Sequence, residues 1–508
     1  MKLLSKFRNE ILLSLFIIVS YFFLRLIFLD RLPMFTDEAI YTRWAQIAVN
    51  DSSWRFISLT DGKQPMFVWA AIVFMKFIDD PLMAARLVSV ASGFFTLIGI
   101  WLLTYELFKN RKVAFLSSTL YVFYPFAQVL DRMALYDSMV GAFFVWSTYF
   151  SVVLVRKVSL EVAYTLGFVI AGGILTKTAN FFSIYLLPFL LILFNFKDKE
   201  IIKKVSRFIL LCAFSTAIAY GLYNVLRLSP LFQMISAKNA IFVYPLNEWL
   251  THPLTFFTGN LYGLFSWLFE YLNIPYIILI AISYVLIHKF PREKIFLTLY
   301  FLLPFVALAL FGRVIFPRFI YFMSLMLLPL AALGLDELIN FTQKKIGLGL
   351  PKSFYGVFLT ILFIAYPLFI CLQFANDPVN SRIANADNKQ YVNSWAAGWG
   401  VKESVEFFKE KAQNQKIFVA TQGTFGLMPE AMELYLIDNP NITIKGYWPV
   451  DFVSEEVLDK ASKMPTYFIF YQKELQVMPP DFPLKLIFEV QQGNRDSYYR
   501  VYQVVPKT

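Results

Sequence analysis

Long apolar runs recur along most of the chain, and they restrict its fold more than any other feature. The first run covers residues 11–29. The runs that follow lie at residues 84–108, 113–130, 138–155, 162–179, 181–196, 207–226, 269–287, 295–311, 318–335 and 353–373. An α-helix needs about 20 apolar residues to cross the hydrocarbon core of a bilayer. The sequence therefore predicts a polytopic α-helical membrane protein with about eleven transmembrane helices.

The composition and the distribution of charge agree with this fold class. Hydrophobic residues make up 58% of the chain and charged residues 16%, whereas soluble domains carry about 25% charged residues. The net charge of +11 could indicate a nucleic-acid partner, but the basic residues are concentrated in short loops between the apolar runs. Cytoplasmic loops collect Lys and Arg, so the N-terminus and these basic loops are predicted to be cytoplasmic: residues 109–112, 156–157, 197–207, 289–294 and 344–352.

The segment from residue 376 onward changes character. Helix-like stretches at 401–412, 428–438 and 454–463 alternate with strand-like stretches, which lie at 416–421, 441–447, 466–471, 484–490 and 497–505. Such alternation favours a partly parallel sheet covered by helices. The sequence thus predicts a membrane domain at 1–375 and an extracytoplasmic α/β domain at 376–508, and it has no glycine-rich nucleotide-binding motif.

The predicted outer loop at residues 30–83 contains two expected helices. The stretch TDEAIYTRWAQIAV reads as a short helix with Thr36 or Asp37 as N-cap and acids in its first turn. The stretch from Lys63 to Asp80 is apolar for about fourteen residues, which is too short to span a bilayer. We expect it to form an interfacial helix on the membrane surface.

Ionisable residues at membrane depth are costly and usually mark function. The predicted outer segments bring several together: Asp37, Glu38, Lys63, Arg132, Asp137, Lys177 and Arg318. Cations could hold the phosphate of a lipid, and a carboxylate could deprotonate a hydroxyl group. Plainer explanations stay open, because the acid pair could cap a helix, Arg132 and Asp137 could form an interfacial ion pair, and Lys177 could reach toward the headgroups. Snorkelling is a more plausible explanation for Arg43, Lys76 and Arg86 than for Lys177.

Metal chemistry is poorly supported by the side chains. The two cysteines, Cys212 and Cys371, lie far apart in apolar runs, and the two histidines, His252 and His288, form no cluster with them. A zinc site of soft ligands is therefore not predicted. A divalent cation held by carboxylates stays an open alternative.

Five short motifs occur in a characteristic order. They are D-E-A-x-Y at 37–41, D-G-K-x-P at 61–65, A-A-R-L at 84–87, R-x-A-L-x-D at 132–137 and L-T-K at 175–177. Together they resemble the polyprenyl-phosphate-sugar-dependent glycosyltransferases of the GT-C class, which include the protein O-mannosyltransferases and the aminoarabinose transferases. The resemblance implies a GT-C fold and transfer of a monosaccharide, with inversion, from a polyprenyl-phosphate donor to an acceptor hydroxyl on the outer face of the membrane.

The resemblance also assigns roles to residues of this chain. It implies that Asp37 is the catalytic base with Glu38 in support, that Asp137 is a second acid, and that Lys63 and Lys177 hold the donor phosphate. Arg132 and Arg318 are predicted to add to this phosphate site. Ile40 stands where the aminoarabinose transferases have an arginine, and no insertion is large enough for the β-trefoil domain of the protein O-mannosyltransferases.

The acceptor is therefore left open among a glycan, a lipid and a protein. A transporter or flippase of lipid-linked sugars is the main alternative, although no internal repeat of the kind common in transporters is evident. A structural or sensory protein would explain the tail but not the grouping of Asp37, Asp137 and Lys177.

Overall fold

The computed structural model describes residues 8–346, 351–472 and 482–506. The chain folds into two compact units. A helical unit consists of Met1–Ile27, Phe56–Phe67 and Leu87–Leu372, and a mixed unit consists of Phe28–Arg55, Val68–Arg86 and Gln373–Thr508. The mixed unit thus combines most of the predicted outer loop with the C-terminal tail.

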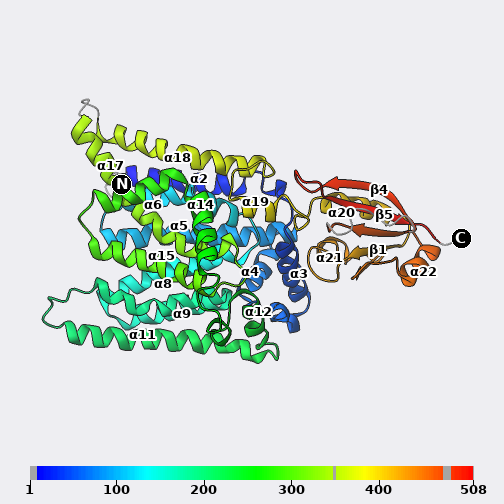
Figure 1. The fold of residues 1–508 in the computed structure, drawn as a ribbon, viewed down its shortest axis with the longest axis horizontal. Coiled ribbons are helices and arrows are strands. Elements are labelled where there is room, and N and C mark those ends of the chain that lie inside the picture. Colours follow the sequence, from blue (N-terminus) through cyan, green and yellow to red (C-terminus); the bar gives the residue numbers. More distant parts are fainter. Residues whose placement is uncertain (1–7, 347–350, 473–481, 507–508) are drawn as a thin grey trace. The chain divides into compact units, whose positions relative to one another are not determined.

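Long helices dominate the helical unit and run side by side in it (Figure 1). Its α-helices are α2 (Arg8–Leu26), α5 (Pro81–Phe108), α6 (Arg111–Val122), α7 (Pro125–Leu130), α8 (Tyr136–Lys157), α9 (Leu160–Thr176), α10 (Phe182–Tyr185), α11 (Ile201–Tyr223), α12 (Met234–Phe242), α13 (Leu246–Trp249), α14 (Phe257–Val285), α15 (Pro291–Phe311), α16 (Tyr321–Ser324), α17 (Leu328–Ile346) and α18 (Lys352–Asn376). The first residues of α5 and the last residues of α18 belong to the mixed unit. Short 3₁₀ turns connect these elements: η3 (Ile57–Asp61), η4 (Thr178–Phe181), η5 (Leu187–Leu193), η6 (Asn224–Leu228), η7 (Pro317–Ile320) and η8 (Leu325–Leu327).

Eight helical segments in the described part of the chain are long and apolar enough to cross a membrane. The predicted polytopic helical fold is confirmed, but three of the eleven expected spans are interrupted or shorter. The run at 113–130 divides between α6 and α7, since Pro125 begins a new helix. The run at 162–179 stops at Thr176, where Lys177 adopts an extended backbone, and the run at 181–196 forms short turns with Pro188 in the last of them.

A buried ion pair ties α2 to the segment between α6 and α8. Arg25 Nε lies 3.1 Å from Asp131 Oδ2, and both side chains are fully buried. The hydroxyl groups of Tyr121 and Ser138 donate to the same carboxylate at 3.0 and 2.6 Å. A buried charge is tolerated only when it is paired and hydrogen-bonded, so this network holds the segment just before the R-x-A-L-x-D motif in place.

The mixed unit contains a five-stranded sheet with the order β2-β1-β3-β5-β4. β1 (Ile417–Gln422) pairs in parallel with β2 (Ile442–Tyr447) and β3 (Thr466–Phe470), whereas β5 (Tyr498–Val504) is antiparallel to β3 and to β4 (Leu484–Gln491). The helices of the tail are α19 (Asn385–Tyr391), α20 (Val401–Lys411), α21 (Glu430–Leu436) and α22 (Glu455–Lys463). The partly parallel sheet and the three helices predicted for the tail are thus confirmed, and α19 is an additional one.

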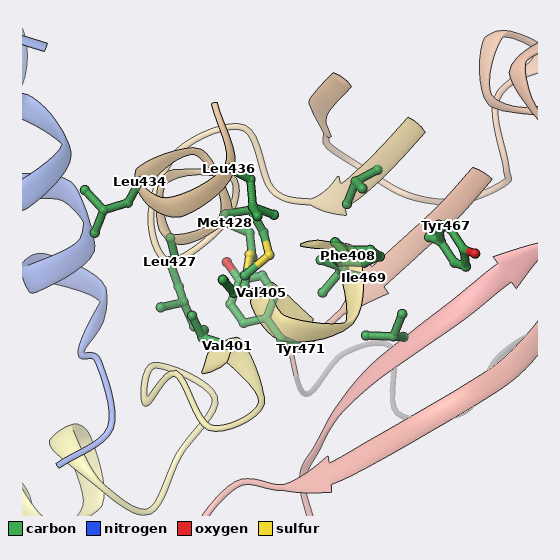
Figure 2. Packing of buried hydrophobic residues seen from close by; sticks show 14 of the residues in the cluster. Val401, Val405, Phe408, Leu427, Met428, Leu434, Leu436, Tyr467, Ile469 and Tyr471 are labelled. Atoms are coloured by element: carbon green, nitrogen blue, oxygen red, sulfur yellow. The ribbon is translucent and has the colours of Figure 1, made fainter. Parts of the chain in front are cut away.

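Part of the predicted outer loop folds with this sheet. It forms η1 (Leu29–Arg31), α3 (Thr36–Asn50), η2 (Ser52–Trp54) and α4 (Met66–Met75). Met34 and Ala39 join the hydrophobic core that covers one face of the sheet. Figure 2 shows this core, in which side chains of α20, of α21 with the two hydrophobic residues shortly before it, and of β3 with the residue after it gather: Val401, Val405, Phe408, Leu427, Met428, Leu434, Leu436, Tyr467, Ile469 and Tyr471. The start of α3 is therefore held by the tail, more than 350 residues later in the chain.

Candidate active site

The predicted site residues divide between the two units. Asp37 and Glu38 belong to the mixed unit. The others belong to the helical unit: Lys63, Arg132, Asp137, Lys177 and Arg318. Each group has its own set of contacts.

The acid pair lies in the first turn of α3. This helix begins at Thr36, and Phe35 is its N-cap with an extended backbone (φ −80°, ψ 150°). Glu38 Oε2 accepts a hydrogen bond from the amide of Phe35 at 3.0 Å. The predicted N-cap at Thr36 or Asp37 is therefore wrong, because the Glu38 side chain satisfies the free amide and the helix starts earlier. Asp37 is partly exposed at a helix N-terminus, where a carboxylate is favoured.

Glu38 and Arg86 form a buried bidentate pair. Arg86 Nε and Nη2 each lie 2.9 Å from an oxygen of the Glu38 carboxylate, and both residues are at most 1% exposed. The guanidinium also donates to the carbonyls of Leu29 at 2.8 Å and Pro33 at 3.0 Å. The snorkelling predicted for Arg86 is wrong, since its charge is inside the protein. The pair connects the first turn of α3 to the start of α5.

A short stretch of the tail also holds the start of α3. Phe35 and Ala397 form an antiparallel bridge, and the amide of Gly398 donates to the Met34 carbonyl at 2.7 Å. The amide and the hydroxyl of Thr36 both donate to the Ala396 carbonyl, each at 3.0 Å. These backbone contacts restrain the residues on either side of the N-cap, and nothing in the local sequence indicated them.

In the helical unit, three phenylalanine rings form a cluster that cations surround. The rings of Phe242, Phe316 and Phe319 contact one another with centroid distances of 5.6 to 6.4 Å. A cation over an aromatic face is attracted by the ring quadrupole. Four cations take such positions within 6.0 Å of a ring centroid: Lys63 and Lys238 over Phe242, Lys177 over Phe319 and Arg318 over Phe316. We refer to these seven residues as the cation–phenylalanine cluster.

Two carboxylates pair with lysines of this cluster. Lys177 Nζ lies 2.8 Å from Asp137 Oδ1 and Lys238 Nζ 2.6 Å from Asp61 Oδ1, and both lysines are about a quarter exposed. A group of four cations suits an anionic ligand such as a phosphate. Among residues 8–346, 351–472 and 482–506, no three His, Cys, Asp or Glu side chains are grouped as metal ligands.

The structure therefore brings together four of the predicted residues, Lys63, Asp137, Lys177 and Arg318, although they come from distant segments. Sequence reasoning missed Lys238 and gave Asp61 no role. The available signal was a lysine in the outer segment at 227–268, followed by aromatic residues. Hydrogen bonds from Gln64 at 2.7 Å and from Asn239 at 3.3 Å to the Thr178 hydroxyl connect the same segments.

Arg132 lies in a different environment. It is 1% exposed, and its Nη1 donates to the carbonyls of Leu24, Arg25 and Ile27 at 2.8 to 3.0 Å. A guanidinium in this position satisfies carbonyls at the C-terminal end of α2, where the helix itself supplies no donors. Its contacts are structural, and we do not include it among the phosphate ligands proposed below.

One carboxyl group near α3 titrates close to neutral pH. Burial raises the pKa of Glu430 to about 7, even though the amide of Gly426 donates to its side chain at 3.0 Å. The neighbouring acid, Glu433, stays paired with Arg43 of α3 at 3.1 Å. The charge of the first turn of α21 therefore changes near neutral pH.

We predict that Gly62→Ala destabilises the protein by about 1–3 kcal/mol. Gly62 has φ +65°, and a Cβ there would lie 2.3 Å from the Met234 carbonyl oxygen and 2.6 Å from Lys238 Cβ. Unfolding of the full chain in detergent, followed by circular dichroism, measures the effect. Gly221→Ala in α11 is the matched control, because nothing lies within 4 Å of its Cβ position; equal stability of the two variants would contradict the prediction.

The family resemblance is supported by comparison with known proteins. Residues 62–220 match the family described as dolichyl-phosphate-mannose-protein mannosyltransferase. This segment contains Lys63, Asp137 and Lys177. A comparison of the whole sequence with curated proteins finds no match.

Solved structures of ArnT and of an archaeal oligosaccharyltransferase are similar in fold to this chain. Apo ArnT from Cupriavidus metallidurans has a TM-score of 0.61 at 14% identity, with 99% of this chain and 100% of that chain covered. The same protein bound to undecaprenyl phosphate has a TM-score of 0.54 at 13% identity and the same coverage. The apo oligosaccharyltransferase from Archaeoglobus fulgidus has a TM-score of 0.52 at 12% identity, covering 91% of this chain and 69% of that chain. At this identity the likeness concerns the fold, and the predicted GT-C fold is confirmed.

Proposed function

For a chain with the GT-C fold of membrane glycosyltransferases, we propose transfer of a monosaccharide from a polyprenyl-phosphate donor to an acceptor hydroxyl on the outer face of the membrane. The observation that carries this proposal is the cation–phenylalanine cluster, which provides four cations within the fold that ArnT uses to bind undecaprenyl phosphate. The family match over residues 62–220 supports the same donor class.

The proposed reaction is a single displacement. Asp37 takes the proton of the acceptor hydroxyl, and the acceptor oxygen forms a bond to the anomeric carbon of the donor. The bond from that carbon to the phosphate oxygen breaks, and its electron pair leaves with polyprenyl phosphate. Attack opposite the leaving group inverts the anomeric configuration. Lys63, Lys177, Lys238 and Arg318 would stabilise the charge that develops on the phosphate.

Asp137 has a supporting role in this scheme. Its 2.8 Å contact with Lys177 holds the ammonium group in place before the donor arrives, and Asp61 does the same for Lys238. Preorganised charges of this kind cost little reorganisation during the reaction.

The direct test uses the purified full-length chain in proteoliposomes with radiolabelled undecaprenyl-phosphate mannose and related donor sugars. An enzyme releases free undecaprenyl phosphate, whereas a flippase moves the intact donor across the bilayer. Absence of release with every polyprenyl-phosphate sugar would contradict the proposed function.

We predict that Lys63→Ala weakens binding of undecaprenyl phosphate about 10-fold to 100-fold, because a charge-assisted hydrogen bond contributes about 1.5–3 kcal/mol. Binding to the full-length chain in detergent, measured by native mass spectrometry, checks this. Lys76→Ala is the matched control, since Lys76 lies in the same stretch of sequence and outside the cluster. An unchanged affinity of Lys63→Ala would remove this lysine from the phosphate site.

A further inference from the structure

The loop between β1 and α21 lies against the start of α3 within the mixed unit. A Cβ built on Gly426 would be 3.6 Å from Thr36 Cγ2 and 4.0 Å from the Tyr471 hydroxyl. Gly426 has φ +131°, a conformation that side-chain-bearing residues rarely adopt. The loop thus approaches through its backbone the residue directly before Asp37.

Two exposed aromatic rings, Phe425 and Trp395, belong to segments that approach the start of α3. Phe425 is 51% exposed, and its ring stacks on the buried Trp44 with centroids 6.3 Å apart. Trp395 is 40% exposed, and its ring lies 6.2 Å from that of the buried Tyr471. Each exposed ring is backed by a buried ring, which fixes its position.

Both rings are attached next to residues that lie close to Thr36. Phe425 precedes Gly426, and Trp395 precedes Ala396, whose carbonyl accepts both hydrogen bonds from Thr36. Neighbouring Cα atoms are 3.8 Å apart. The backbone segments that carry the two rings therefore lie close to the start of α3, which carries Asp37.

We propose that Trp395 and Phe425 form the acceptor subsite and that this subsite takes a sugar ring. The proposal rests on the proposed function, because Asp37 must meet the hydroxyl that it deprotonates. A pyranose has an apolar C–H face, which packs on aromatic rings, and a hydroxyl edge that remains free to react. An extended peptide would instead pair with backbone groups, but those of Ala396 and Gly398 are already bonded to Met34 and Thr36.

Saturation-transfer NMR tests the subsite, with the full-length chain in lipid nanodiscs and chitobiose as the sugar probe. We expect millimolar binding with the strongest transfer at the ring C–H protons. Trp395→Ala and Phe425→Ala should each weaken binding at least fivefold. Phe452→Ala is the matched control, since this residue is 69% exposed in the loop before α22, whose core lies on the other face of the sheet. Equal binding by all three variants, or no binding by the unaltered chain, would overturn the proposal.

Release of undecaprenyl phosphate separates this inference from the proposed function. With donor alone, transfer to water should be the same in the unaltered chain, Trp395→Ala and Phe425→Ala, because their cation–phenylalanine clusters are identical. Loss of this release in the two variants would mean that the rings act on the donor, which contradicts an acceptor role. If the unaltered chain releases no undecaprenyl phosphate at all while chitobiose binding depends on both rings, the enzyme assignment fails and the sugar site remains.

Discussion

Asp37→Asn is expected to lower the rate of sugar transfer about 10²-fold to 10⁴-fold, the contribution of a general base. The amide has nearly the size of the carboxylate but cannot take the proton of the acceptor hydroxyl. Binding of undecaprenyl phosphate should stay within twofold, because the proposed phosphate ligands are other residues. Single-turnover release of undecaprenyl phosphate from the donor, in the presence of acceptor, measures the rate.

The matched control for this variant is Asp51→Asn at the other end of α3. Asp51 is exposed and caps a 3₁₀ turn by accepting from the amide of Ser53 at 2.9 Å, a bond that an asparagine also accepts. We expect normal transfer from this control. If Asp37→Asn retained full turnover, Asp37 would not be the base, and Asp137 would become the next candidate.

Local sequence patterns were sufficient for most of the fold. Eight of the apolar runs became the long helices, and the strand-like segments of the tail became β1 to β5. The prediction was less accurate where a run contained a break. Pro125 divides the expected third span, and Pro188 lies in a turn of the expected sixth. Proline has no backbone amide to donate and therefore interrupts a helix. The criteria of length and hydropathy do not take this into account.

The candidate site was predictable where short motifs carry it and not where distant segments meet. The D-G-K motif indicated Lys63, but the position of Lys238 over the same Phe242 ring depends on how α12 packs on Gly62. Likewise, the paired acids were visible in the sequence, whereas the burial of Glu38 against Arg86 follows from the packing of α3 on α5. The chemical type of each side chain can be read from the sequence, but its burial and its interaction partners depend on the tertiary fold.

Glu38→Gln and Arg86→Met are each expected to destabilise the protein by about 3–5 kcal/mol, the effect of breaking a buried ion pair. Glu38→Gln leaves the Arg86 guanidinium with an uncompensated charge, and Arg86→Met leaves a buried carboxylate. The double variant should be less destabilised than the sum of the two, because neither charge remains. Chemical unfolding of the full chain in detergent measures the three free energies. Arg43→Met is the control, since its pair with Glu433 is partly exposed and should contribute about 0–1 kcal/mol.

The same double variant distinguishes two roles for Glu38. If Glu38 only holds α3, removing both charges should restore part of the stability lost in Arg86→Met and should restore transfer in parallel. If the Glu38 carboxylate also contacts the acceptor, stability recovers without transfer. We expect parallel recovery, because both carboxylate oxygens already accept hydrogen bonds from Arg86 and one also accepts from the Phe35 amide. Additive losses of stability in the double variant would contradict the buried-pair account itself.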